Sequence, residues 1–112
     1  MKIVDKISVK ELKEMAQRMY GSLVKADVDI AKEVVIIDME MHADGEASLI
    51  DQGSKQRDVW GINLKPELYK SPDFIEFDSM INIDPRENPS RDVLDPKIRQ
   101  KITDIIDGVV HD

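Results

Sequence analysis

Apolar and polar residues alternate along residues 73–85, "DFIEFDSMINIDP". At a period of two, Ile75, Phe77, Ile81 and Ile83 fall on one side of the segment, and Glu76, Asp78, Asn82 and Asp84 fall on the other. This alternation is typical of a strand that has one face on a hydrophobic core and the other in water or against a partner. The segment therefore predicts a half-buried sheet.

Similar alternation predicts two hairpins. Residues 23–29 and 34–41 form the first, joined by the short loop "IAKE". In its second strand Val35, Ile37, Met39 and Met41 alternate with Asp38, Glu40 and His42. Residues 59–64 pair with the 73–85 strand in the second hairpin, through a polar connection that contains two prolines. Residues 2–6 could add a short edge strand.

Helical spacing and capping residues predict three helices. The first follows Ser8 and Glu11, a capping-box pair, and places Leu12, Met15, Ala16, Met19 and Tyr20 on one stripe. The second is expected from about Asp44, as its N-cap, to Gln52. The third begins at the Asp95 cap with Pro96 in its first turn, and its apolar stripe is Ile98, Ile102, Ile105, Ile106 and Val109.

The element order is therefore α-β-β-α-β-β-α. We expect an α+β fold in which a four-stranded, mainly antiparallel sheet from two hairpins carries three helices mostly on one face. With 112 residues and no composition break, residues 1–112 form a single domain.

Charge and composition exclude several classes of function. The 23 acidic and 16 basic residues give a formal charge of −7, which argues against a nucleic-acid partner. Cysteine is absent and there are two histidines, so neither disulfides nor a structural zinc site is expected. The longest apolar run, residues 34–37, is too short for a membrane span, so we expect a soluble cytoplasmic protein without a membrane partner.

The polar sides of the four strands would meet on one face of the sheet. Most of the residues on that face would be carboxylates. The full set is Lys25, Asp27, Asp29, Asp38, Glu40, His42, Asn63, Glu76, Asp78, Asn82 and Asp84. Like charges opposite one another across strands are destabilising, so solvent, basic loop residues, a cation or a partner must relieve them. An ordinary solvated face is an equally good interpretation.

Glu40, His42 and Asp44 form the densest cluster on that face. A Glu, a His and an Asp could bind a divalent ion, or supply a base and its orienting partner. No established ligand spacing surrounds His42, however. The simpler interpretation is that His42 makes a hydrogen bond near a strand end while Asp44 caps the helix, and we favour it.

Arg86 and Arg91 lie in the long aperiodic segment 84–95. Arginine can meet a carboxylate with two parallel hydrogen bonds, so we expect these side chains to neutralise Glu76 or Asp78 from within the chain. The alternative is that they bind an anionic ligand.

The runs "HADGEASLIDQGSKQRDVWGINLKP" and "DFIEFDSMINIDPRENPSR" resemble a family of small uncharacterised bacterial and archaeal proteins, classed as a domain of unknown function. The resemblance covers nearly the whole chain, and its "WGINL" and "FIEFDSMINI" strings are its most specific parts. It implies a free-standing small prokaryotic protein and assigns no activity and no catalytic residue.

We therefore expect a small binding or interaction protein that forms homo-oligomers, rather than an enzyme, with no cofactor and no metal. One alternative is a divalent-metal-dependent hydrolase that uses carboxylates on the open sheet face. Another is a regulatory protein that binds a small ligand, whose identity the sequence does not name, through the two arginines. The candidate ligand-binding residues are Glu40, His42, Asp44, Glu76, Asp78, Asn82, Arg86 and Arg91.

Overall fold

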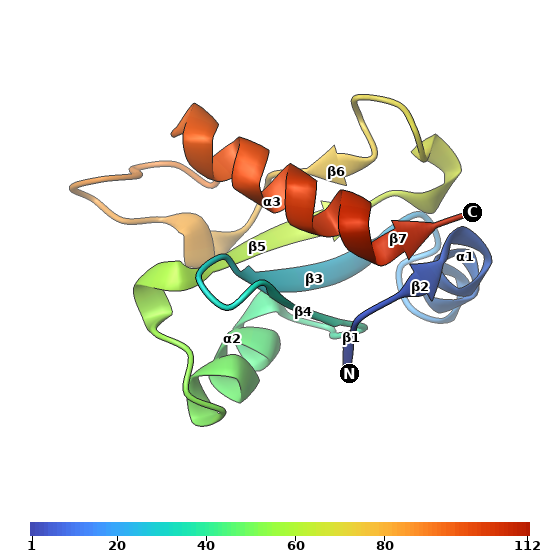
Figure 1. Ribbon diagram of the computed structural model, residues 1–112, viewed down its shortest axis with the longest axis horizontal. Coiled ribbons are helices and arrows are strands. Elements are labelled where there is room, and N and C mark those ends of the chain that lie inside the picture. The colour runs from blue at the N-terminus through green and yellow to red at the C-terminus, as the bar shows by residue number, and fades with distance from the viewer.

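The computed structural model describes residues 1–112 and contains a five-stranded antiparallel sheet with three helices. The strand order is β1-β4-β3-β5-β6 (Figure 1). The strands are β1 (Lys2–Val4), β3 (Val24–Asp29), β4 (Val34–Ile37), β5 (Val59–Leu64) and β6 (Ile75–Glu76). The α+β class is confirmed, whereas the four-strand count is wrong because β1 adds an edge strand against β4.

The first predicted hairpin is confirmed as β3 and β4. In its register Ala26 lies opposite Ile37, and Asp29 lies opposite Val34. Its second strand ends four residues earlier than predicted, because Asp38 has a φ of +69° that no extended strand accommodates. This turn moves Met39 to the opposite face of the sheet, where it packs against Ile36.

The second predicted hairpin is confirmed only for the two residue pairs nearest its connecting loop. β5 and β6 pair through Asn63 with Glu76 and Leu64 with Ile75, and the strand then ends. The chain continues into η3 (Met80–Asn82), a 3-10 helix. The prediction of one strand over residues 73–85 is therefore wrong.

Hydrogen bonds from side chains explain this departure. Ser79 caps η3 by accepting a bond from the Ile81 amide. The Asn82 side chain then bonds both the N–H and the C=O of Gly61, which a continued strand would otherwise have paired. Ile83 becomes exposed instead of facing the core.

The first and last helices begin at the predicted caps. Ser8 accepts a bond from the Glu11 amide at the start of α1 (Val9–Arg18), and Asp95 accepts one from Lys97 at the start of α3 (Pro96–Val109). The predicted Asp44 cap is wrong: the N-cap of α2 (His42–Asp51) is Met41, three residues earlier.

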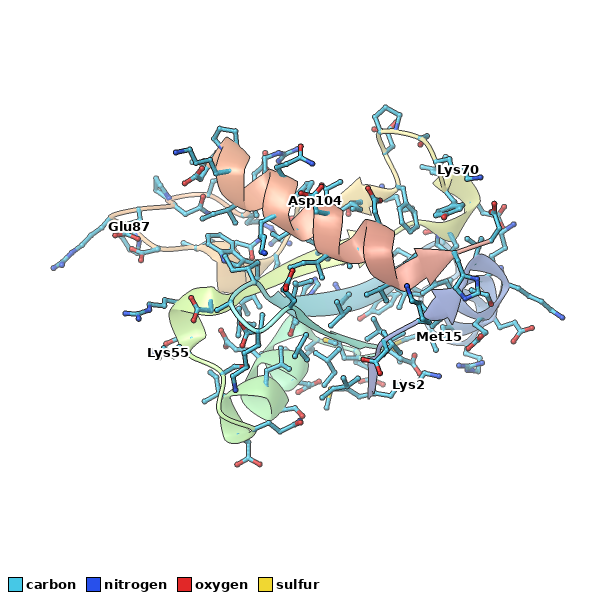
Figure 2. The ribbon with its side chains drawn as sticks, in the orientation of Figure 1. Lys2, Met15, Lys55, Lys70, Glu87 and Asp104 are labelled. Carbon is cyan, nitrogen blue, oxygen red and sulfur yellow. The ribbon has the colours of Figure 1, made fainter.

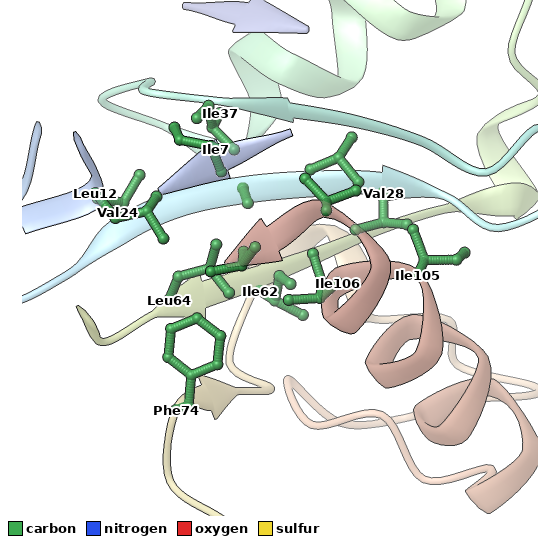
Figure 3. Packing of buried hydrophobic residues seen from close by; sticks show 14 of the residues in the cluster. Ile7, Leu12, Val24, Val28, Ile37, Ile62, Leu64, Phe74, Ile105 and Ile106 are labelled. Atoms are coloured by element: carbon green, nitrogen blue, oxygen red, sulfur yellow. The ribbon is translucent and has the colours of Figure 1, made fainter. Parts of the chain in front are cut away.

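The main core lies between the sheet and the helices α1 and α3. Figure 3 shows Val28 of β3 and Ile62 of β5 facing Ile105 and Ile106 of α3, with Leu12 of α1 at one end. These five side chains are buried, which is the apolar half of the alternation seen in the sequence. Two of the three helices therefore cover the predicted face.

The opposite face of the sheet is not open, which corrects the sequence prediction. α2 crosses it, on the other side of the sheet from α3 (Figure 1). A second apolar cluster of Ile36, Met39, Leu49 and Val59 fastens α2 there. The polar face is thus largely an interior surface between the sheet, α2 and η3.

Three shorter elements complete the fold. β2 (Ile7–Ser8) and β7 (Val110–His111) pair in parallel and join the two ends of the chain. Two further 3-10 helices, η1 (Gln56–Asp58) and η2 (Pro66–Leu68), flank β5. No helix has the length and apolar character needed to cross a bilayer.

Candidate functional site

The predicted site residues do not form one surface cluster. His42 and Asn82 are buried, Glu76 and Asp78 are partly exposed, and the others lie at the surface, namely Glu40, Asp44, Arg86 and Arg91. The proposed grouping of Glu40, His42 and Asp44 is wrong, because His42 opens α2 and turns inward while the two carboxylates remain outside.

His42 instead lies at the centre of a buried polar network. Its Nδ1 lies 2.9 Å from Asp27 Oδ1 on β3, and its Nε2 lies 3.1 Å from Asn63 Oδ1 on β5. The His42 side chain is 7 % exposed, and Asp27 is fully buried. The helix start is therefore bonded to the two central strands of the sheet.

A chain of bonds continues from Asn63 to the surface. Asn63 Nδ2 donates to Glu76 Oε1 at 2.8 Å, and Glu76 Oε2 pairs with Lys65 Nζ at 2.8 Å. The hydrogen bond from Lys65, and then that from Asn63, lowers the pKa of Glu76 below its ordinary value. Because an acceptor holds Nδ2, the Asn63 carbonyl oxygen must face His42.

Two glycines allow α2 and η3 to approach the sheet this closely. A Cβ on Gly45 of α2 would overlap Asp27 Oδ2 and lie 2.6 Å from Met39 Sδ. A Cβ on Gly61 of β5 would overlap Ser79 Oγ and lie 2.9 Å from His42 Nδ1. The requirement is for space rather than for an unusual φ, since neither backbone is left-handed.

Asp27 differs sharply from Asp29, its neighbour on the same face of β3. Asp29 accepts bonds from the Ala31 and Lys32 amides at 2.9 Å and from Ser54 Oγ at 2.5 Å. Asp27 has only His42 as a side-chain partner, and its buried Oδ2 makes no hydrogen bond of normal geometry, although the backbone N–H of Glu46 lies near enough to lower the pKa of Asp27 slightly. An ionised carboxylate is therefore well satisfied at Asp29 and poorly satisfied at Asp27.

Burial is the main reason that the pKa of Asp27 rises from 3.8 to about 6. The hydrogen bond and the charge of His42 act in the opposite direction, the negative charge of Glu46 on α2 adds to the increase, and the backbone N–H of Glu46 slightly reduces it. Asp27 therefore holds a proton more strongly in the folded protein than in an unfolded chain.

Two asparagines organise the segment that follows β6. Asn88 Nδ2 donates to the carbonyls of Asn82, Ser90 and Asp92, and its Oδ1 accepts from the Leu94 amide. The long segment 84–95, which reaches the tip labelled Glu87 in Figure 2, is thus anchored by the buried side chain of Asn88, together with that of Asn82, which donates to the Arg91 carbonyl.

A groove of about 400 Å³ lies beside this segment. Its lining includes Arg57 and Trp60 together with Asn82, Ile83 and Pro85. The amide of Asn82 is fully used within the chain, by Gly61 and by the Arg91 carbonyl. Asn82 therefore shapes the groove wall and has no free hydrogen-bonding group for a ligand.

The arginine prediction holds for one residue. Arg91 Nε lies 2.6 Å from Asp78 Oδ1, so Arg91 does neutralise a carboxylate from within the chain, although through one hydrogen bond rather than the expected two. Glu76 is paired with Lys65 instead, and Arg86 is exposed and forms no ion pair. Both members of the Arg91–Asp78 pair are about half exposed, so water screens their attraction.

The arrangement does not match the geometry of the common catalytic sites. No group of three or more His, Asp or Glu side chains is placed to hold a metal ion, as the hydrolase alternative requires. Ser79 is 1 % exposed and bonds the Ile81 amide rather than His42. What the network can do chemically is hold a proton and fasten α2 to the sheet.

Sequence reasoning placed Asp27 and Asn63 on the polar face but did not select them. The available signal was the isolated Gly61 between Val59 and Asn63, because a glycine within a strand often marks a close approach. Gly45 within α2 gave the same signal. Neither glycine reveals which side chain approaches it.

Comparison with known proteins gives a family and no activity. No curated protein matches this sequence, and no solved structure matches it. A family model matches residues 1–109, nearly the full length over which the fold and its buried network extend. The chain therefore belongs to the family described as "Protein of unknown function (DUF5674)".

Proposed function

We propose that this protein is a non-enzymatic interaction protein that works as a homodimer joined at the outer edge of β1. The observation that carries this proposal is that β1 ends the sheet with an unpaired edge on which apolar side chains are exposed. Its residue Ile3 is 44 % exposed, and the preceding Met1 is 56 % exposed. Exposed strand edges of this kind are ready templates for pairing with another chain.

The hydrogen-bond pattern supports the same conclusion. The Asp38 amide donates to the Lys25 carbonyl, one step beyond the β3–β4 pairing. Hydrogen-bonded and non-hydrogen-bonded residue pairs alternate along an antiparallel ladder, so Ile36, two residues before Asp38, also directs its backbone N–H and C=O toward β3. Ile3 lies opposite Ile36 in the β1–β4 register, so the N–H and C=O of Ile3 point away from the sheet.

A second copy of β1 fits this edge. A two-fold axis at Ile3 places Ile3 opposite its own copy, Lys2 opposite Val4, and Met1 opposite Asp5. No like charges then face one another, whereas centring the axis on Val4 would oppose Lys2 and Lys6. Exchange of two bonds between the Ile3 residues would join two sheets into one.

Apolar surface beside the edge adds area to such a contact. Met1, Met19 and Met39 line a shallow hollow near β1 and α2, whose remaining wall is formed by Ala47 and by the carboxylates Asp38, Glu40 and Asp44, and Met19 is itself exposed. Methionine side chains adapt readily to an opposing surface. The other end of the sheet offers less, because β6 has two residues and Asn82 already bonds the free edge of β5.

The proposal is tested by measuring the mass of the protein in solution, with light scattering after size-exclusion chromatography. Protein concentrations of about 10 and about 200 μM cover the range in which a homodimer of moderate affinity forms. We expect a dimer that Ile3→Lys and Ile3→Pro convert to a monomer, because proline removes the outward N–H but no β1–β4 bond. Ile83→Lys is the matched control, since Ile83 is 42 % exposed and lies outside this edge.

A monomeric wild-type protein at the higher concentration would refute the proposal. So would an Ile3→Lys variant that remains dimeric. The prokaryotic origin and the cytoplasmic location stay predictions of the sequence.

A further inference from the structure

We propose that Asp27, His42 and Asn63 form a proton-dependent latch that fastens the start of α2 to the sheet and loosens when its proton is lost. The latch concerns the stability of α2 and does not depend on the proposed dimer.

Counting donors and acceptors shows why the latch needs a proton. Asn63 Oδ1 and Asp27 Oδ1 are both acceptors, and they face the two ring nitrogens of His42 at 3.1 and 2.9 Å. A neutral imidazole carries one N–H, and the Asn63 oxygen requires it on Nε2. The contact between Nδ1 and Asp27 is therefore a hydrogen bond only when a further proton lies on Nδ1 or on the carboxyl.

Loss of this proton leaves two electron-rich atoms facing each other in the interior. The imidazole lone pair then meets a carboxylate oxygen, and the second oxygen of Asp27 makes no hydrogen bond of normal geometry. The backbone N–H of Glu46 gives the carboxylate weak support, which is smaller than the effect of burial. Repulsion and poor solvation both favour separation of His42 from β3. Because His42 is the first residue of α2, the helix start must move with it.

The surroundings of the pair do not replace the missing proton. The groups packed around the pair are mostly uncharged: Ile36 of β4 is apolar, and Ser79 and Asn82 at η3 are neutral. The charged groups are the carboxyl of Glu46 on α2 and, on the far side of Asn63, the ion pair of Glu76 with Lys65. The nearest additional charge, that of Glu46, is negative and raises the pKa of Asp27. Release of the proton therefore occurs in the range about pH 5 to 7 rather than near the value of a free aspartate.

Hydrogen exchange of the intact protein tests the latch through the backbone amides of α2. An opening that returns Asp27 from a pKa of about 6 to 3.8 should become about a hundredfold more frequent between about pH 4 and 7. After correction for intrinsic exchange, the protection of α2 should fall by that factor. The sign is diagnostic, since the lowered pKa of Glu76 makes the fold less stable as the pH falls.

Two variants separate the latch from general charge effects. Asp27→Asn can donate its amide to Nδ1 without any added proton, so the decrease in α2 protection with rising pH should disappear in this variant. Asp44→Asn removes an exposed carboxylate from the first turn of the same helix and should keep the wild-type pH dependence. Constant α2 protection in the wild type, or an unchanged pH dependence in Asp27→Asn, would overturn the proposal.

A ¹⁵N NMR spectrum of the histidine rings in the wild-type protein gives a second test, which does not require any variant to fold. We expect a slowly exchanging proton on Nε2 of His42 throughout the range, because Asn63 accepts it in the interior. The exposed ring of His111 should show none and serves as the internal reference. A His42 ring that carries its persistent proton on Nδ1 alone would contradict the latch.

Discussion

Replacing Asp27 by asparagine should stabilise the protein at neutral pH, although Asp27 is among its most buried side chains. The substitution keeps the size of the side chain and removes a charge that the interior satisfies poorly. Its amide can donate to His42 Nδ1, and its carbonyl can take the position of the unpartnered Oδ2. An uncharged network in which both ring nitrogens of His42 are hydrogen-bonded then replaces a titrating one.

The magnitude follows from the pKa of Asp27. Raising that pKa from 3.8 to about 6 means that ionising the folded protein costs about 3 kcal/mol more than ionising the unfolded chain. The bound proton therefore contributes stability that is fully present below about pH 4 and is lost as the pH rises through about 6. Asp27→Asn should gain up to about 3 kcal/mol at about pH 7 and little at about pH 4.

Asp29→Asn is the matched comparison, on the same strand and the same face. Its carboxylate accepts hydrogen bonds from two backbone amides on one oxygen and from the Ser54 hydroxyl on the other, and asparagine has only one acceptor oxygen for these three donors. Neutralising it should cost about 1 to 3 kcal/mol at about pH 7. Two identical substitutions two residues apart are thus expected to have opposite signs.

Urea unfolding of the three proteins, followed by circular dichroism at both pH values, measures these differences. An Asp27→Asn variant that loses more than about 1 kcal/mol at about pH 7 would refute the reasoning, because the buried carboxylate would then be favourable. A gain of equal size at both pH values would show that the effect does not arise from ionisation.

Further substitutions test the packing around the network. Gly61→Ala should cost about 1 to 3 kcal/mol in urea unfolding, because the added methyl group overlaps Ser79 and crowds His42; a loss below about 0.5 kcal/mol would contradict the close approach. Ile102→Asp should abolish folding as judged by circular dichroism, since the fully buried charge costs several kcal/mol against a total of about 5–15 kcal/mol. Arg91→Glu should lower the melting temperature at about pH 7, by about 1 kcal/mol or less of stability, with a smaller effect at about pH 4, where carboxylates in general begin to be protonated; equal melting curves would show that the pair is inert.

Local chemistry along the chain determined the elements that depend on nearby residues. The caps at Ser8 and Asp95 were predictable because each bonds an amide two or three residues away. The β3–β4 hairpin was predictable because its short loop and its alternation act together. The α+β class followed from these elements.

Tertiary contacts decided the rest. The strand predicted over residues 73–85 ends after Glu76 because Asn82 bonds Gly61 across the fold, a competition that alternation does not encode. The position of α2 on the polar face depends on space left by Gly45 and Gly61. Periodicity sorts residues onto faces, but it does not state which element covers each face.

The candidate site shows the same division. The sequence placed His42 among carboxylates and favoured a hydrogen bond over a ligand role for it, and the structure supplies that bond through Asp27 and Asn63. Asp27 and Asp29 are equivalent by pattern, since both lie on the polar side of one strand. Only the fold distinguishes them, because solvation and hydrogen bonding of a buried carboxylate depend on the groups that three-dimensional packing brings to each oxygen.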